Sequence, residues 1–283
     1  MKRLLDCNTS DLKKMNKEER LAAIEASEGR ILIQELSLFQ QTQLLEPLSD
    51  AEIACAFGAD MLLLNAFDCN APQIPGIECE AEEVIRKLNA YTGRLIGVNL
   101  EPVGNSSLLS ERSALPAGRM ATVENAEKVK KLGFDYIVLT GNPGTGVDNT
   151  AIIKALQEMR AVAGDDLILM AGKMHAAGSK TEAGCNIINK EQIHAFISAG
   201  ADVILLPAPG TVPGITFEFI SEMIAYVHSL GKLTLTAIGT SQEGASAATI
   251  EQIALMCKMA GTDLHHIGDA AIGGMDPENL MTY

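Results

Sequence analysis

The most constraining feature of this sequence is a short phrase that recurs four times: glycine, any residue, aspartate and then an apolar run. The four copies begin at Gly58, Gly133, Gly200 and Gly261, and each follows a segment with helical periodicity. A glycine at the end of a helix adopts the left-handed conformation that closes it, and the apolar run after it is typical of a short buried strand. The phrase therefore predicts four helix-to-strand junctions.

Four further apolar runs complete a regular alternation of strands and helices. They begin at Ile31, Leu95, Leu167 and Leu233, so that eight predicted strands start 30 to 40 residues apart. Continuous apolar strands alternating with amphipathic helices indicate a parallel sheet covered by helices. Eight such units predict a (β/α)8 TIM barrel, a single domain over residues 1–283. The competing prediction is a doubly wound open sheet, but its dinucleotide-binding form carries a Gly-x-Gly-x-x-Gly that the first strand here lacks.

Capping sequences mark where several helices begin. Boxes of the form Ser/Thr/Asn-x-x-Glu/Gln, and one Asp-Pro pair, occur at Asn16, Ser49, Asn189, Thr249 and Asp276. The first of them lies within residues 10–28, which we expect to form a leading helix that closes the N-terminal end of a barrel spanning residues 30–283.

The final helix is short. It begins at Pro277 and has seven residues, so it leaves apolar surface uncovered between its neighbours. We therefore expect a homo-oligomer in which a second copy covers this surface. The alternative is a chain that was cut short at this point.

Composition excludes several classes of protein. The 22 Lys and Arg against 36 Asp and Glu give a net charge of −14, the wrong sign for coating nucleic acid or an anionic membrane. No apolar run approaches the roughly 20 residues of a membrane span, and the first residues lack a signal peptide. The six cysteines form no C-x-x-C pair, which is typical of reduced thiols. We expect a cytoplasmic protein that binds neither nucleic acid nor a membrane.

The candidate catalytic residues follow from the fold, because TIM barrels carry their active sites at the C-terminal ends of the strands. After the fifth strand stand Lys173, fit to neutralise an anion or form a Schiff base, and His175, fit for proton transfer. Alternation along the last strand places His266 inside the barrel and His265 against the helices. His266 or Glu101 is the candidate second acid–base group. The alternatives are a solvated lysine and histidines simply hydrogen-bonded in the core.

Glycine-rich loops at the same ends of the strands are candidate anion sites. Backbone N–H groups that no side chain blocks bind phosphates, and barrels often do so after the seventh and eighth strands. We predict a small phosphorylated or carboxylated ligand, although glycine also serves tight turns that bind nothing. The predicted anion-binding residues are Gly239, Thr240, Ser241, Gly268, Gly273, Gly274, Gly141 and Asn142.

Carboxylates at the strand ends are candidate metal ligands. Glu35, Asp68 and Asp269, with Asn65 and Asn99, offer the oxygen atoms that Mg²⁺ or Mn²⁺ prefers. The spacing matches no fixed metal signature. The alternatives are that Asp269 caps a helix and that Glu35 pairs with Lys173.

Five phrases of the sequence carry a resemblance to a known family. They stand at Ser27–Arg30, Gly58–Asn65, Gly97–Pro102, Leu139–Gly146 and His265–Asp269. On these phrases the chain resembles, over nearly its whole length, a family of uncharacterised bacterial TIM-barrel proteins, some of which carry labels such as phosphoenolpyruvate phosphonomutase-like or haloacid dehalogenase-like. The loops after the seventh and eighth strands are similar to those of phosphate-binding barrels. The resemblance implies the barrel and no particular activity.

These observations predict a lyase or isomerase that acts next to a carbonyl group. Lys173 and His175 would polarise the substrate and transfer protons. Since one fold hosts many activities, two alternatives stand beside this prediction. They are a noncatalytic metabolite-binding regulatory protein and a divalent-metal-dependent hydrolase.

Overall fold

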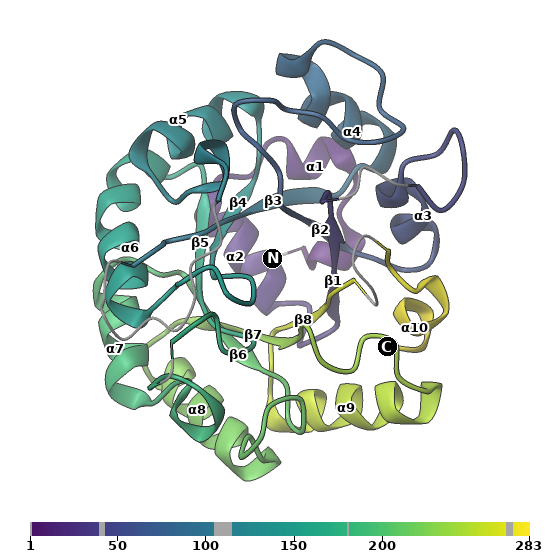
Figure 1. Ribbon diagram of the computed structural model, residues 1–283. Coiled ribbons are helices and arrows are strands. Elements are labelled where there is room, and N and C mark those ends of the chain that lie inside the picture. The colour runs from purple at the N-terminus through teal and green to yellow at the C-terminus, as the bar shows by residue number, and fades with distance from the viewer. Residues whose placement is uncertain (1, 40–42, 105–114, 180, 270–273) are drawn as a thin grey trace.

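The computed structural model describes residues 2–39, 43–104, 115–179, 181–269 and 274–283, which form a closed barrel of eight parallel strands ringed by helices (Figure 1). Each strand pairs with the next one in the chain, and the last pairs with the first. The predicted (β/α)8 fold is confirmed, and the open sheet is excluded. The strands are β1 Ile31–Ser37, β2 Met61–Asn65, β3 Leu95–Leu100, β4 Tyr136–Leu139, β5 Ile168–Gly172, β6 Val203–Pro207, β7 Leu233–Ile238 and β8 Leu264–Ile267.

Most helices begin where their capping residues predict. The side chains of Ser49, Asn189 and Asp276 all accept backbone N–H groups of the helices that follow them. The prediction that a helix begins at Thr249 was wrong. Ala247 and Ala248 are strong helix formers, and they extend that helix back to its N-cap at Ser246. The outer helices are α3 Asp50–Ala56, α4 Val84–Thr92, α5 Val123–Leu132, α6 Asn149–Ala163, α7 Lys190–Ser198, α8 Phe217–Ser229, α9 Ala247–Ala260 and α10 Pro277–Thr282.

The N-terminal segment covers one end of the barrel. In place of one helix over residues 10–28 it forms two, α1 Thr9–Leu12 and α2 Lys17–Glu25, because Asn8 and Asn16 each build a capping box and so begin separate helices. Ile24 of α2 packs into the same apolar cluster as the inward side chains of the strands. That end of the barrel is therefore filled.

The aspartate of the recurring phrase joins the strands in pairs. All four glycines have positive φ, as the phrase predicts. Each aspartate stands just before an even-numbered strand, and its carboxylate accepts a backbone N–H from the preceding odd-numbered strand, at 2.7 to 3.0 Å. The same aspartate hydrogen bond thus joins the strands of four pairs, β1–β2, β3–β4, β5–β6 and β7–β8. The acceptor and donor pairs are Asp60 with Leu32, Asp135 with Ile96, Asp202 with Leu169, and Asp263 with Thr234.

Two of these aspartates also hold α2 against the barrel. Arg20 lies 3.2 Å from the Asp135 carboxylate, and Lys17 lies 3.4 Å from that of Asp202. Burial raises the pKa of Asp135, and the charge of Arg20 opposes this effect. The closing helix and the strand pairs are therefore fixed by the same carboxylates.

The interior of the barrel is filled with side chains. Tyr136 is fully buried, and its hydroxyl donates to the carbonyl of Leu62 at 2.6 Å. Its ring lies against Gly97, where a Cβ atom would come within 2.0 Å of the ring. The core therefore blocks passage through the barrel, and chemistry is left to its C-terminal mouth.

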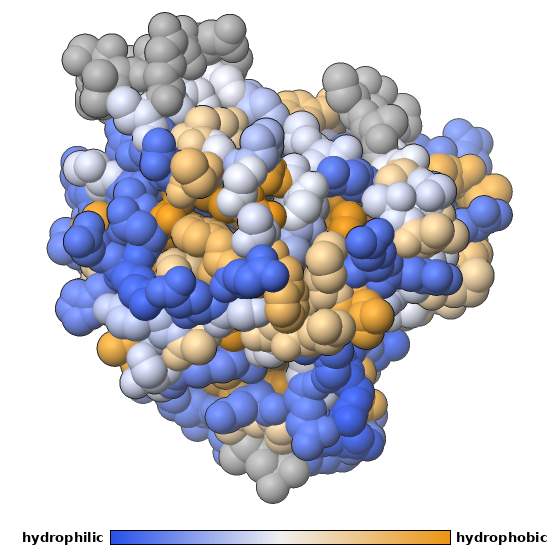
Figure 2. Space-filling model, turned by 90° about the horizontal axis from the view of Figure 1, so that it is seen from below, coloured by the Kyte–Doolittle hydropathy of each residue, from blue (hydrophilic) through white to orange (hydrophobic). Residues whose placement is uncertain are grey.

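An apolar surface lies beside the short α10. Phe57, Leu255 and Met281, which are 37%, 60% and 67% exposed, line a groove of about 530 Å³. Figure 2 views the molecule from the side of α8 and α9, and it shows hydrophobic residues across the middle of that side with hydrophilic ones around them. The homo-oligomer expected at the short final helix remains a prediction.

None of the helices within the described ranges is long and apolar enough to cross a membrane.

The strand-joining role of the aspartates predicts the effect of Asp135→Ala. The substitution leaves the N–H of Ile96 without its acceptor and Arg20 without its partner. We expect the free energy of unfolding to fall by about 2 kcal/mol in urea titrations. In the control Asp166→Ala, an exposed carboxylate that pairs with Lys130 is lost, and the expected change is below about 0.5 kcal/mol. Equal losses in the two variants would contradict this role.

Candidate functional site

Polar side chains from the ends of seven strands surround a small cavity at the C-terminal mouth of the barrel. Its volume is about 20 Å³, which is room for one water molecule or one functional group of a ligand. The aligned ends of parallel strands bring these residues together across more than 200 positions of sequence. The lining residues are Glu35, Asn65, Asn99, Thr140, Gly141, Asn142, Met174, His175, Gly239, Thr240, Glu243, Gly268 and Asp269.

Glu35, which lines the cavity, is hydrogen-bonded to the fully buried His266. His266 Nε2 and Glu35 Oε2 are 2.8 Å apart, across the neighbouring strands β8 and β1. Asn65 donates to the other carboxylate oxygen at 2.7 Å. Burial alone would raise the pKa of Glu35, but the hydrogen bonds from His266 and Asn65 outweigh it and hold that pKa below its usual range. Glu35 is therefore an ionised acceptor, and His266 donates its Nε2–H.

The two histidines of β8 face opposite ways, as the alternation predicts. His265 contacts the carbonyl of Gly29 at 3.1 Å and the hydroxyl of Tyr283 at 3.2 Å, on the helix side of the strand. Burial lowers its pKa to about 4. His265 is thus a neutral structural histidine, and His266 is the one inside the barrel.

Of the two residues predicted after β5, the structure brings only His175 into the cavity. Lys173 is buried beside it but pairs with Glu182, while Met174 takes the inward position. The strict alternation that aligns Lys173 with His175 ends with β5, at Gly172. Burial lowers the pKa of Lys173 to about 8 and that of His175 below its usual range, so the imidazole is neutral at pH 7. The alternative pairing of Lys173 with Glu35 is also absent, because Glu35 pairs with His266.

Glu101 positions a loop rather than lining the cavity. Its carboxylate pairs with Arg119 and accepts the backbone and side-chain N–H groups of Asn142, both at 3.1 Å. Arg119 comes from the loop after β3 and also lies 4.5 Å from the ring centre of Phe39. No pattern in the sequence points to Arg119, because only the fold of that loop brings it to Glu101.

The predicted anion site after β7 already holds a carboxylate of the chain, that of Glu243. Ser241 donates its backbone N–H to Glu243 at 2.7 Å, and further backbone N–H groups, including that of Thr240, support it. Thr240 has a φ of 56°, an uncommon conformation outside glycine. Burial raises the pKa of Glu243. The sequence analysis did not predict Glu243 as a site residue, although it stands only two positions after the predicted Ser241.

Among the other predicted anion-binding residues, Gly239, Gly141, Asn142 and Gly268 line the cavity. Asn142 gives its backbone N–H to Glu101, and Gly141 packs so closely on Val147 that a Cβ atom would lie 2.4 Å away. Gly268 borders the Glu243 carboxylate. Gly274 does not line the cavity, and Gly273 lies outside the described residues. The N–H groups of Ser241 and Asn142 therefore bind glutamates of the chain in this structure, and the predicted anion site remains a prediction.

The three predicted metal ligands are not brought together. Glu35 and Asp269 line the cavity, but Asp68 lies apart and accepts the N–H of Asn70 at 2.8 Å. Over the described ranges, no group of three or more His, Cys, Asp or Glu residues is placed to hold a metal ion. The Mg²⁺ or Mn²⁺ expected from the sequence remains a prediction.

Four buried polar atoms at the mouth have no hydrogen-bond partner among the described residues. They belong to residues that are at most 4% exposed. Such atoms are rare in native proteins, because each one costs free energy unless water or a ligand meets it. We call them the open atoms: Asn99 Oδ1, Thr140 Oγ1, Glu243 Oε1 and His266 Nδ1.

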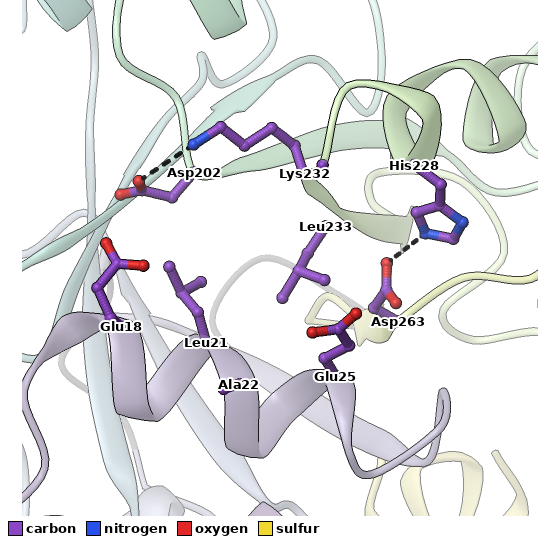
Figure 3. Close-up of a pocket in the computed structure, with 10 residues that line it drawn as sticks. Glu18, Leu21, Ala22, Glu25, Asp202, His228, Lys232, Leu233 and Asp263 are labelled. Carbon is purple, nitrogen blue, oxygen red and sulfur yellow. Dashed lines mark hydrogen bonds and ion pairs between the residues drawn. The ribbon is translucent and has the colours of Figure 1, made fainter.

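A larger cavity, of about 430 Å³, lies at the opposite end of the barrel. Figure 3 shows Glu18 and Glu25 of α2 along one side and Asp202, His228 and Asp263 on the other. Asp202 and Asp263 there hold strand pairs together. This end of a TIM barrel serves stability, so the smaller cavity at the mouth is the candidate active site.

Comparison with known proteins supports the fold and leaves the activity open. The model of a family described as "Domain of unknown function (DUF7916)" matches residues 5–283. Comparison with curated proteins gives no match.

Similar solved structures are TIM-barrel enzymes. One is 2,3-dimethylmalate lyase, a member of the PEP mutase/isocitrate lyase superfamily, with a TM-score of 0.53 and 13% identity over 94% of this chain and 82% of that one. Phosphonopyruvate hydrolase in complex with oxalate and Mg²⁺ has a TM-score of 0.52 and 17% identity over 91% and 82%. The carboxyl transferase domain of Rhizobium etli pyruvate carboxylase has a TM-score of 0.57 and 12% identity over 96% and 49%. At these identities the likeness shows the fold alone.

The burial of His265 predicts how stability depends on pH. Between pH 6.5 and about 4 the unfolded chain binds a proton that folded His265 does not, so its contribution falls as the pH falls through this window. We expect the stability difference between the wild type and His265→Leu to shrink by up to about 3 kcal/mol from pH 7 to pH 4. Urea unfolding at both pH values measures it.

His228→Gln is the control for this pH dependence. The hydrogen bond to Asp263 raises the pKa of His228, so its contribution is present at low pH and lost as the pH rises. The difference between the wild type and His228→Gln should therefore change in the opposite direction. The same trend in both variants would show that the pH dependence arises elsewhere.

Proposed function

The chain belongs to the DUF7916 family, and from the geometry of its barrel mouth we propose that it is a lyase or isomerase acting next to a carbonyl group of a small metabolite. The observation that carries the proposal is the buried Glu35–His266 pair, together with the open Nδ1 of His266. Because ionised Glu35 can only accept, it fixes the proton on Nε2 and leaves a lone pair on Nδ1. A histidine held in this way is suited to act as a general base.

Glu243 is suited to the complementary step. Its pKa is raised by burial, whereas that of Glu35 is lowered by its partners, so the two carboxyl groups favour opposite protonation states. Environments that push two such groups apart are typical of acid–base pairs in active sites. Glu243 also lies near enough to His266 for the two to interact electrostatically.

These roles account for a proton transfer next to a carbonyl. His266 Nδ1 would take the proton from the carbon beside the carbonyl group, and the carboxylic acid of Glu243 would donate a proton to the carbonyl oxygen. An isomerase returns a proton to a neighbouring carbon, and a lyase breaks a bond at that carbon. Lys173 takes no part, because it faces Glu182.

The phosphorylated or carboxylated ligand expected from the sequence remains an alternative for this site. One observation favours it: the loop after β7 binds the carboxylate of Glu243. An anion that displaced Glu243 could therefore accept hydrogen bonds from the same backbone N–H groups. A regulatory protein that binds a metabolite without turnover is the alternative from another class.

Deuterium exchange tests the proposal whatever the product of the reaction is. The protein is incubated in D₂O with a panel of 2-oxo acids, hydroxyketones and sugar phosphates, and proton NMR follows loss of the hydrogen beside the carbonyl. We expect catalysed exchange with at least one compound, and a decrease of at least about 100-fold in Glu35→Gln and His266→Gln.

Two surface variants serve as matched controls. Glu222→Gln and His194→Gln carry the same changes at exposed positions on α8 and α7 and should keep the wild-type rate. Exchange that is equally fast in Glu35→Gln and His266→Gln would overturn the assignment of the base. Binding without exchange in the wild type would favour the regulatory protein.

A further inference from the structure

We propose that the ligand at the mouth is an uncharged hydroxylated carbonyl compound, such as a hydroxyketone or short sugar, with a hydroxyl group that donates to Asn99 and a carbonyl oxygen that accepts from Glu243. This inference rests on the proposed function and names the substrate class of the same site. It follows from the hydrogen-bonding capacity that the described residues leave unused and from the charges around the cavity.

Two of the open atoms, Asn99 Oδ1 and Glu243 Oε1, are side-chain oxygens. The Asn99 amide cannot be turned over to change this, because its Nδ2 already donates to Asn65 Oδ1 at 3.2 Å. Turning it would place two amide oxygens against each other. The second oxygen of the Glu243 carboxylate, Oε2, accepts the N–H of Ser241. Asn99 Oδ1 therefore requires a donor from outside the protein. The proton that Glu243 carries as an acid lies on Oε1, and it requires an acceptor.

Thr140 extends the same pattern. Its hydroxyl is 3% exposed and lines the cavity with the two oxygens. A hydroxyl can donate to one group of a ligand and accept from another. The cavity of about 20 Å³ admits one functional group, so these three residues are placed to contact the same end of the ligand.

The charges around the cavity disfavour a phosphate. Among its described lining residues there is no lysine or arginine, and His175 is neutral at pH 7. The N–H groups of Ser241 and Asn142 are occupied by glutamates of the chain. A phosphate ester would thus meet carboxylates with no cation to compensate it.

The site does not demand a cationic ligand either. Both oxygens of Glu35 accept hydrogen bonds within the chain, from His266 and Asn65, and Glu101 pairs with Arg119. A polar ligand without net charge is therefore the class that satisfies the open atoms and leaves these pairs intact.

Matched ligands test the charge of the substrate. Thermal unfolding is followed with dihydroxyacetone and dihydroxyacetone phosphate, with glycolaldehyde and glyoxylate, and with inorganic phosphate alone. We expect the uncharged member of each pair to raise the melting temperature by at least a few degrees more than its anionic partner. Stronger stabilisation by the phosphate ester, the carboxylate or inorganic phosphate would overturn the proposal, and so would no shift with either member.

Thr140→Val tests whether the open atoms are kept for a ligand. Valine has the shape of threonine without the unpartnered hydroxyl, so the ligand-free variant should melt a few degrees higher than the wild type and lose its response to the hydroxylated compounds. Thr211→Val is the control, because the hydroxyl of Thr211, which is also buried, donates to the carbonyl of Ala208 at 2.7 Å, and its loss should lower the melting temperature. A lower melting temperature in Thr140→Val would mean that a bound water already satisfies Thr140, which overturns the proposal.

The two proposals fail in different ways. If uncharged compounds bind and no hydrogen beside their carbonyl exchanges, the ligand class stands and the catalytic proposal fails. If only the phosphate ester binds and exchanges, the catalytic proposal stands and the ligand class fails.

Discussion

Four aspartate carboxylates, each accepting the backbone N–H of the preceding strand, connect the barrel into two-strand units. They lie at the N-terminal ends of the strands, where Asp135 and Asp202 also bind the cations of the closing helix α2. Each copy of the recurring phrase therefore ends a helix, begins a strand and joins that strand to its neighbour. Two of the copies also hold α2 at the N-terminal end of the barrel. Because these contacts stabilise the N-terminal end of the barrel, the side chains at the C-terminal ends of the strands can take part in binding and catalysis.

The polar groups at the C-terminal mouth differ in whether they have partners within the chain. The carboxylates of the mouth have such partners: Glu35 accepts from His266, Glu101 pairs with Arg119, and Glu243 accepts from the backbone of its own loop. What remains unmet is hydrogen-bonding capacity, and it is concentrated in the open atoms. A site whose described lining has carboxylates and no lysine or arginine differs in kind from a phosphate cradle. The glycine loops alone suggested such a cradle, because they show that N–H groups are available and not which acceptor in the chain occupies them.

The parts predicted from the sequence are those set by local periodicity. The Gly-x-Asp phrase and the alternation of apolar runs determine the eight strands, and the two-residue period of β8 separates His265 from His266. The errors arise where that periodicity stops. Alternation ends with β5 and sends Lys173 away from the cavity, while Arg119 and Glu243 reach their positions only through the paths of their loops. Loop paths depend on long-range contacts, which a single sequence does not display.

A crystal structure of the protein with a bound hydroxyketone, at a resolution that places ordered water, tests the central claim most directly. The account predicts an oxygen of the ligand within hydrogen-bond distance of Thr140 Oγ1 or Asn99 Oδ1, with the 2.8 Å contact between His266 and Glu35 intact. Two results would contradict it: a ligand bound instead in the cavity of Figure 3, or an ordered water that is hydrogen-bonded to these atoms whether or not the ligand is present.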